Sequence, residues 1–167
     1  ALAVATAAEY ENAGTVEFLV DSSGDIYFLE MNTRIQVEHT ITEMVTGIDL
    51  VKEQISVAAG EPLSFNSVEP TGHAIEFRIN AEDPTNNFRP NPGTLIEHRE
   101  PGGLGIRVDS GVEAGGQISQ YYDNLIAKLV VWGRDRNEAI ARGKRALRDY
   151  RVTGLHTTIP AHIQILD

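Results

Sequence analysis

The residues best able to do chemistry lie in one short segment, EMNTRIQVEH, at positions 30–39. This segment holds two carboxylates, two side-chain amides, a guanidinium and an imidazole, and it directly follows the apolar run IYFL. A solvated loop can have this composition, but such a loop does not usually continue from a buried strand. The segment therefore raises the question of which ligand needs so many charged groups beside a strand.

Two short strands are expected to position this segment. Residues 15–20 (TVEFLV) alternate with the period of a strand, and residues 26–32 (IYFLEMN) form a second strand after the turn cluster DSSGD. We expect the two strands to form an antiparallel hairpin with Ser23 and Gly24 as a two-residue loop.

With that loop, Glu17 lies directly across from Glu30, and Asn32 shares a face with Glu30. Two carboxylates side by side repel each other, and a folded protein keeps such a pair when a cation lies between them. Carboxylate and amide oxygens are the ligands that Mg²⁺ takes when it also binds nucleotide phosphates. The alternative is that Glu17 faces solvent and Glu30 pairs with Arg34 or Lys52, and the uncertain register leaves both interpretations open.

Two further residues suggest an anion and a base. The Arg34 guanidinium beside a Mg²⁺ site suits a carboxylate, a phosphate or bicarbonate, although a surface arginine is the more common case. Glu38 is a candidate general base near the same anion, or a carboxylate that the N-terminal dipole of a helix favours. His39 is more typical of a packing or hydrogen-bonding histidine than of a catalyst.

The composition limits the possible functions. The chain has 167 residues, a formal net charge of -10 and no cysteine. The acidity argues against general nucleic-acid binding but allows a phosphate ligand held by local cations or a metal ion. The lack of cysteine excludes disulfides, thiolate nucleophiles and Cys-based zinc sites, and it is compatible with a reducing compartment. No apolar run approaches the roughly 20 residues that span a membrane.

The remaining elements of the first half are helical. TITE at positions 40–43 fits a capping box, so a helix is expected from Thr40 to near Gly47. Asp49 is expected to cap a second helix. Its apolar stripe is Val51, Ile55, Ala58 and Ala59. Residues 61–70 read as a linker that contains a domain boundary. The start, ALAVATAAEYENAG, lacks the basic region of a signal peptide and reads as the middle of a helix, so we expect a fragment or a processed piece.

The second half predicts strands followed by helices. HAIEFRINAED is a strand with Ile75, Phe77 and Ile79 on one face, TLIEHR and GIRVDS look like a hairpin, and NLIAKLVVWG is the central strand. A helix from Asp135 to Tyr150 and a short last helix at Thr158 and Pro160 follow. The inner stripe of the longer helix is Ala139, Gly143, Leu147 and Tyr150. Strands and helices in separate runs favour an α+β fold over an alternating plan.

The sequence resembles biotin carboxylases over nearly its whole length. The segment from GTVEFLV to DLVKEQI looks like the closing part of their ATP-grasp domain, and GHAIEFRINAEDP and YYDNLIAKLVVWGRDRNEAIARGKRAL resemble their C-terminal domain. E-x-N-x-R alone is shared by several ATP-grasp ligases, but EMNTRIQVEH followed by RINAED is highly specific. The resemblance implies that residues 1–62 close an ATP-grasp domain and that residues 70–167 form a C-terminal domain with a mainly antiparallel sheet.

The resemblance also assigns site residues. Glu17, Glu30 and Asn32 match the metal positions of the family, where Mg²⁺ or Mn²⁺ ions bridge the phosphates of ATP. The remaining matches concern bicarbonate and biotin: the bicarbonate-binding Arg34, Gln36 and the amide of Val37, the base Glu38, and Arg78, which steadies the enolate of biotin.

The implied enzyme is an ATP-dependent ligase that carboxylates biotin in two stages. Bicarbonate, deprotonated by Glu38, attacks the γ-phosphate of ATP to give carboxyphosphate, and this intermediate releases CO₂ beside N1 of biotin. The implied protein partners are a biotin carboxyl carrier and a carboxyltransferase, each in another domain or a separate subunit. A second copy in a homodimer is also implied, with no nucleic acid and no membrane. The resemblance implies the cytoplasm as the compartment, or the mitochondrion in a eukaryote.

Several questions stay open on the sequence. The final acceptor of the carboxyl group, such as acetyl-CoA for fatty acid biosynthesis, propionyl-CoA, methylcrotonyl-CoA, pyruvate or urea, depends on another domain. The chain has no Gly-rich phosphate lid and no AMKM biotin acceptor, so we expect no carboxylase activity from it alone. The alternatives are another ATP-grasp ligase, such as a carbamoyl phosphate synthetase-like enzyme, and a scaffold that dimerises or docks partners. GGLGIRV resembles the dimer interface of the family.

Overall fold

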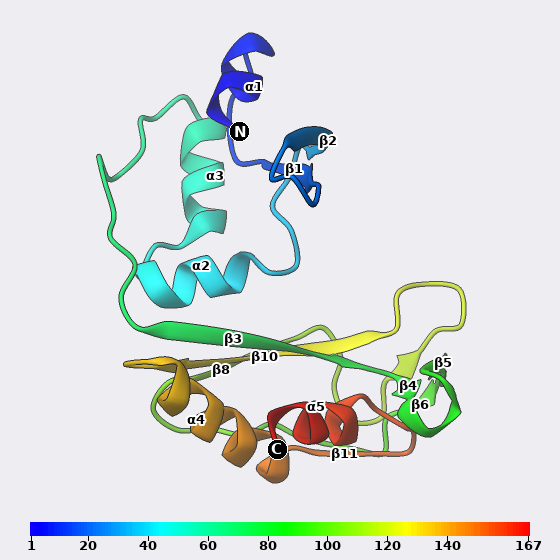
Figure 1. Ribbon diagram of the computed structural model, residues 1–167. Helices are drawn as coiled ribbons and strands as arrows, with labels where there is room; N and C mark the ends of the chain where they lie inside the picture. Colours follow the sequence, from blue (N-terminus) through cyan, green and yellow to red (C-terminus); the bar gives the residue numbers. More distant parts are fainter. The chain divides into compact units, whose positions relative to one another are not determined.

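The computed structural model describes residues 1–167, and the chain divides into two compact units, Ala1–Pro70 and Thr71–Asp167 (Figure 1). Unit 1 contains helix α1 (Leu2–Ala7), the hairpin of β1 (Thr15–Val20) and β2 (Ile26–Asn32), and helices α2 (His39–Thr46) and α3 (Leu50–Ala58). The two predicted strands and their antiparallel pairing are confirmed. No helix is both long enough and apolar enough to cross a membrane.

The predicted two-residue loop of the hairpin is wrong. Val20 pairs with Ile26, and the backbone N–H of Asp21 donates to the carbonyl of Asp25 at 3.1 Å, so residues 22–24 form a three-residue loop. The Asp21 carboxylate closes this loop by accepting bonds from the amides of Ser23 and Asp25 at 2.8 and 3.0 Å. These bonds, that from Asp25 foremost, hold the pKa of Asp21 below its usual value.

The expected pairing of Glu17 with Glu30 is nevertheless confirmed, because a β-bulge compensates for the longer loop. The register shifts between Glu17 and Phe18, where β2 carries one extra residue, Leu29. Glu17 therefore returns to its place across from Glu30.

The helices of unit 1 agree in part with the expectations. Asp49 caps α3 by accepting a bond from the amide of Lys52 at 2.8 Å, and Gly47 ends α2 in the left-handed region at φ 73°, as expected. The predicted cap at Thr40 is wrong: α2 begins at His39 with Glu38 in the cap position, and Thr40 lies fully buried in the first turn.

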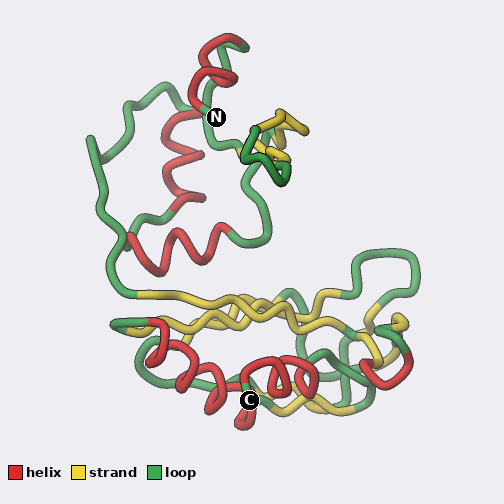
Figure 2. The backbone as a smooth tube through the Cα atoms, viewed as in Figure 1, coloured by secondary structure: helices red, strands yellow, loops and turns green.

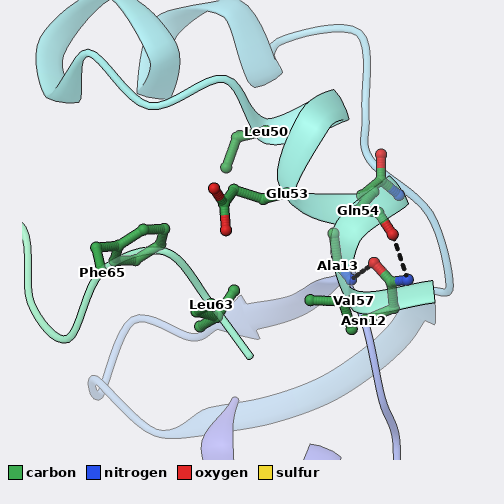
Figure 3. Close-up of a pocket in the computed structure, with 8 residues that line it drawn as sticks. All are labelled: Asn12, Ala13, Leu50, Glu53, Gln54, Val57, Leu63 and Phe65. Carbon is green, nitrogen blue, oxygen red and sulfur yellow. Dashed lines mark hydrogen bonds between the residues drawn. The ribbon is translucent and has the colours of Figure 1, made fainter. Parts of the chain in front are cut away.

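The apolar stripe predicted for α3 is also wrong. Val51 and Ile55 are 43% and 67% exposed. The helix instead turns another face toward a pocket of about 330 Å³ (Figure 3). Residues Asn12, Ala13, Leu50, Glu53, Gln54, Val57, Leu63 and Phe65 line this pocket. Glu53 ties the chain beyond α3 to the helix, since its carboxylate accepts bonds from the amide and the hydroxyl of Ser64.

Unit 2 is built on an antiparallel sheet in the order β3–β10–β8, formed by β3 (His73–Asn80), β10 (Leu125–Gly133) and β8 (Ile106–Ser110). The predicted central strand is confirmed. Helices α4 (Arg136–Asp149) and α5 (Ile159–Leu166) lie against one face of this sheet (Figure 2). The predicted inner stripe of α4 is buried, and Asp135 caps this helix through the amide of Glu138 at 2.8 Å.

Short pieces complete unit 2. They are β4 (Glu82–Asp83) with β5 (Arg89–Pro90), the 3-10 turn η1 (Pro84–Asn86), β6 (Gly93–Thr94) with β9 (Gln117–Ile118), and β7 (Glu97–Arg99) with β11 (Arg151–Thr153). The predicted hairpin of TLIEHR and GIRVDS is therefore wrong, because β7 pairs with β11 and β8 pairs with β10. Gly103 and Gly105, with φ of 111° and 73°, turn the chain between β7 and β8 so that the carbonyl of Gly105 accepts a bond from the amide of Trp132 at 2.8 Å.

The core lies between the sheet of unit 2 and its two helices. Ile79 on β3 and Leu129 on β10 are fully buried, and Leu147 on α4 is 1% exposed. Gly143 allows α4 to approach β3 closely, because a Cβ atom at that position would lie 2.9 Å from Cζ of Phe77. The predicted inward face of β3 is confirmed by the burial of Phe77 and Ile79.

Candidate active site

The end of the hairpin brings two carboxylates to one point. The Asn32 side-chain amide donates to Oε1 of Glu17 at 3.0 Å and to Oε1 of Glu30 at 3.1 Å. Both carboxylates therefore converge on a single atom, which occupies the place that a cation between them would take. The bulge at Leu29 makes this convergence possible, since it restores the pairing of Glu17 with Glu30.

The donor set fits a Mg²⁺ or Mn²⁺ ion that is also bound to phosphates. Rotation of the Asn32 amide by half a turn would present its oxygen beside the oxygens of Glu17 and Glu30. Hard oxygen ligands of this kind suit Mg²⁺, which keeps its other positions for water and phosphate oxygens. The structure contains no cluster of three or more His, Asp or Glu side chains that could hold a metal ion, and the ligand set here consists of two carboxylates and one amide.

A chain of side-chain hydrogen bonds extends from these carboxylates into the following loop. Gln36 donates to the same Oε1 of Glu17 at 2.8 Å, and Nη2 of Arg34 donates to Oδ1 of Asn32 at 3.4 Å. Nη1 of Arg34 also donates to the carbonyl of Ile35 at 3.1 Å. The guanidinium is thus drawn toward Asn32 and not into a separate ion pair with Glu30.

Glu38 lies at the N-terminal end of α2, four residues beyond Arg34. It lines a cavity of about 440 Å³ together with Gln36 and His39. Gln36 belongs both to this cavity and to the carboxylate cluster, and so it links Glu38 to Glu17. The ring of His39 donates to the carbonyl of Gln36 at 2.9 Å, which makes it a structural histidine as expected.

Arg78 lies in unit 2, on the polar face of β3. Its side chain is 51% exposed, and its Nε lies 3.8 Å from Oε1 of Glu76, whose side chain is only 7% exposed. Lys128 stands directly across from Arg78 on β10, and its Nζ lies 3.7 Å from Oδ2 of Asp109 on β8. Lys128 and Asp109 had no signal in the sequence, because the pairing of distant strands decides which of these charges meet.

The structure thus brings together five of the predicted site residues through hydrogen bonds and connects a sixth through a shared cavity. The five are Glu17, Glu30, Asn32, Arg34 and Gln36. Glu38 is the sixth. Val37 lies between Gln36 and Glu38 in the same loop, whereas Arg78 belongs to the other unit.

Two domain families match the chain. Residues 1–66 match the family described as carbamoyl-phosphate synthase L chain, ATP binding domain, and residues 76–167 match the biotin carboxylase C-terminal domain. Among curated proteins, a pyruvate carboxylase subunit of Methanothermobacter thermautotrophicus is 62% identical over 159 residues, which are 94% of this chain and 32% of that protein. A biotin carboxylase of a Nostoc species is 58% identical over 160 residues, which are 95% of this chain and 36% of that protein.

Solved structures give the same result. The biotin carboxylase domain dimer of the 2-oxoglutarate carboxylase of Hydrogenobacter thermophilus, in complex with MgADP, ADP and bicarbonate, matches with a TM-score of 0.92 and 49% identity. The match covers 97% of this chain and 36% of that one. The chain spans about a third of the length of the curated relatives it matches. Because the C-terminal domain match alone covers more than half of the residues, the chain belongs to the biotin carboxylase family.

Proposed function

We propose that this chain is part of an ATP- and bicarbonate-dependent biotin carboxylase, the enzyme of the first half-reaction of a biotin-dependent carboxylase. The observation that carries the proposal is the convergence of Glu17 and Glu30 on Asn32 at the start of EMNTRIQVEH. The MgADP and bicarbonate in the Hydrogenobacter thermophilus structure support the same chemistry. Residues 1–62 would close the ATP-grasp domain and residues 70–167 would form the C-terminal domain, in line with the family matches.

Glu17, Glu30 and Asn32 would hold a Mg²⁺ or Mn²⁺ ion, whose contribution is the electrostatic stabilisation of charge on the ATP phosphates. The bond from Gln36 to Glu17 keeps the Glu17 carboxylate directed to that point. Oδ1 of Asn32 accepts from Arg34 in the structure, so the rotation of the amide that presents this oxygen to a metal ion would also release the guanidinium to bind the anion.

Arg34, Gln36 and the backbone amide of Val37 bind bicarbonate in this proposal, and Glu38 takes its proton. The bicarbonate oxygen then forms a bond to the γ-phosphorus as the bond to ADP breaks, which gives carboxyphosphate. Loss of CO₂ from this intermediate leaves a phosphate ion, which takes the proton from N1 of biotin, and the deprotonated N1 then attacks the CO₂. Arg78 stabilises the negative charge on the ureido oxygen of biotin at that stage.

The test of Glu38 is its replacement by glutamine in the intact protein that contains this chain. We expect Glu38→Gln to lower the rate of ATP cleavage that depends on bicarbonate and biotin by about 10²- to 10⁴-fold, the usual contribution of a general base. Glu61→Gln, at an exposed position beyond α3, is the matched control and should leave the rate unchanged. A wild-type rate in Glu38→Gln would remove Glu38 from the role of base.

The metal ligands have a separate test that does not depend on turnover. Glu30→Gln in the intact protein should weaken the binding of Mn²⁺ in the presence of ADP, followed by electron paramagnetic resonance. Asp25→Asn, at the exposed tip of the same hairpin, should leave this binding unchanged. Equal Mn²⁺ affinity in the two variants would contradict the assignment of Glu30.

We further propose that the intact protein forms a homodimer through unit 2 and works with a biotin carboxyl carrier and a carboxyltransferase. The dimer in the Hydrogenobacter thermophilus structure supports the first point. Leu104, in GGLGIRV, is 82% exposed and has the character of an interface residue. Arg107 in the same segment is a poorer probe, because it forms two bonds to Asp109 within the chain at 2.7 and 2.8 Å. Sedimentation of Leu104→Asp should show a lower mass than the wild type, and an unchanged mass would exclude this surface.

A further inference from the structure

We infer that the first turn of α5 positions Arg78, and that Thr158 and His162 are its positioning residues. The inference rests on the proposed function, in which the Arg78 guanidinium stabilises the charge on biotin. Neither Thr158 nor His162 belongs to the carboxylate cluster at the end of the hairpin. Both contact the backbone of Arg78 and not a substrate.

The contacts converge on one carbonyl group. The backbone oxygen of Arg78 accepts a bond from Oγ1 of Thr158 at 2.8 Å and a second from Nε2 of His162 at 2.9 Å. Both lone pairs of this oxygen are therefore used, and the His162 ring must carry its hydrogen on Nε2. The Thr158 side chain makes no capping bond to the amides at the start of α5, and its hydroxyl instead contacts β3.

Thr158 also holds the residue two places further along β3. Its Oγ1 accepts a bond from the amide of Asn80 at 3.1 Å, and its own amide donates to the carbonyl of Asn80 at 3.1 Å. Together with the bond to Arg78, this arrangement takes the place of a neighbouring strand. The backbone on both sides of Ile79 is thus fixed by one threonine.

The strand needs this support, because the sheet holds it from one side only. β3 is an edge strand, with β10 as its only neighbour. Its pairing with β10 is irregular at this place, since the register shifts between Leu125 and Ala127, across from Asn80 and Ile79. Contacts from α5 therefore add to the sheet in fixing the backbone at Arg78.

Helix α5 is itself firmly attached to the core. Thr158 is 5% exposed, and Ile159 and Ala161 are each 9% exposed. The His162 ring lies edge-on to Phe77 with 5.4 Å between the ring centroids, and Phe77 packs on Gly143 of α4 from within the core. The backbone of Arg78 is thereby tied to the core of unit 2.

A half-exposed arginine depends on such an anchor. The Arg78 side chain is 51% exposed, and Oε1 of Glu76 lies 3.8 Å from its Nε. Because the side chain is attached to this backbone, any movement of the backbone at Arg78 passes to the guanidinium, and a displacement of about 1 Å can cost on the order of 100-fold in rate. The anchor is therefore expected to matter for the step at biotin and not for the step at bicarbonate.

The experiment uses paired variants of the intact protein. Thr158→Val and His162→Leu remove the donors to the Arg78 carbonyl, whereas Thr158→Ser and His162→Gln keep a donor at each place. We expect each of the first two variants to lower kcat/KM for biotin by about 10-fold or more. The KM for bicarbonate, and the slow cleavage of ATP with bicarbonate but without biotin, should stay within about twofold of the wild type, because Arg78 acts at biotin and not at bicarbonate. A twofold change corresponds to less than about 1 kcal/mol. The serine and glutamine variants should restore kcat/KM for biotin.

Three outcomes overturn the inference. These are an unchanged kcat/KM for biotin in both donor-free variants, an equal fall in the cleavage of ATP without biotin, and a failure of the serine and glutamine variants to restore activity. If Thr158→Val does not fold, His162→Leu still decides the matter, because His162 is only half-buried. Failure of the proposed function looks different: wild-type protein without biotin-dependent cleavage of ATP, or Arg78→Ala with full activity, would remove the role of Arg78 itself.

Discussion

The two units of this chain divide stability and chemistry between them. All of the buried hydrophobic side chains lie in unit 2, from Phe77 to Ala161, whereas the only buried side chain of unit 1 is that of Thr40. Seven of the eight predicted site residues nevertheless lie in unit 1. The hairpin that presents them exposes large apolar side chains, such as Leu19 at 57% and Ile26 at 68%.

This difference shows that the carboxylate cluster does not depend on a local hydrophobic core. Backbone pairing and hydrogen bonds between side chains hold Glu17, Glu30 and Asn32 in place. A two-stranded hairpin is marginal by itself, so the apolar surface of β1 and β2 is expected to need further partners in the intact protein. In unit 2, by contrast, a hydrophobic core is present, and Arg78 lies on the edge strand β3 that packs on this core.

The comparison predicts the largest effect for a pair of leucines. Leu129→Ala in β10, where the side chain is fully buried, should lower the free energy of unfolding by about 2–5 kcal/mol. Leu29→Ala in the hairpin, where the side chain is 51% exposed, should change it by less than about 0.5 kcal/mol. Urea unfolding of the 167-residue chain, followed by circular dichroism and by the fluorescence of Trp132, measures both. A similar loss in the free energy of unfolding for the two variants would show that side chains of unit 1 contribute to stability as much as those of unit 2.

A glycine tests how closely the core of unit 2 is packed. Gly143→Ala should destabilise the chain by about 1–3 kcal/mol, because the new Cβ atom would lie 2.9 Å from Phe77 and 3.3 Å from Leu166. Gly111→Ala is the control, since its Cβ atom would meet nothing within 4 Å. The same urea titration compares them, and a neutral Gly143→Ala would mean that α4 can move away from β3 without loss.

A buried hydroxyl gives a smaller effect with a distinctive pH dependence. The Tyr150 hydroxyl lies 2.9 Å from Nε2 of His98, whose Nδ1 donates to the carbonyl of Val112 at 3.2 Å. Burial foremost, and then the charge of Glu100, raise the pKa of Tyr150 well above its usual value. Tyr150→Phe should cost about 1 kcal/mol at neutral pH, the usual net contribution of one hydrogen bond.

The sign of the pH effect follows from the raised pKa of Tyr150. An unfolded tyrosine ionises near pH 10, whereas folded Tyr150 keeps its proton to a higher pH. Ionisation therefore stabilises the unfolded state relative to the folded state as the pH rises above 10. The stability of the wild type should therefore be complete below pH 10 and fall above it, more steeply than that of Tyr150→Phe. If stability falls equally with pH in the wild type and in Tyr150→Phe, the Tyr150 hydroxyl is in contact with water.

The smallest expected difference concerns the two aspartates that cap helices. Asp135→Ala should lower the stability of unit 2 by about 1 kcal/mol or less, through the lost bond to the amide of Glu138. Asp49→Ala removes an equivalent bond to Lys52 in unit 1 and should leave the fluorescence transition of Trp132 unchanged. A shift of that transition by Asp49→Ala would show that the two units unfold together.

Sequence reasoning worked best where structure is local. The strands of the hairpin, the caps at Asp49 and Asp135 and the central position of β10 depend on patterns within a few residues, and all are confirmed. The hairpin expected from TLIEHR and GIRVDS failed because the partner of β7 is β11, about 50 residues further along the chain. Thr40 has the pattern of a cap but is buried, and no local pattern reports burial by distant residues.

The candidate site was predicted in the same uneven way. The pairing of Glu17 with Glu30 was expected from a two-residue loop, but it arises from a longer loop and a bulge that compensate for each other. The bonds from Gln36 to Glu17 and from Arg34 to Asn32 depend on the path of an irregular loop, which periodicity does not describe. The support of Arg78 by Thr158 joins residues 80 positions apart and had no signal in the sequence.

The bulge at Leu29 separates the length of the hairpin loop from the alignment of its carboxylates. The strands pair in one register next to the loop and in another, shifted by one residue, at Glu17. The same residues could instead form a two-residue loop without a bulge, and Glu17 would again lie across from Glu30. Because the loop lies beyond the last strand pair, removal of one loop residue leaves the pairs from Val20 to Glu17 as they are, so different residues determine the length of the tip and the alignment of the carboxylates.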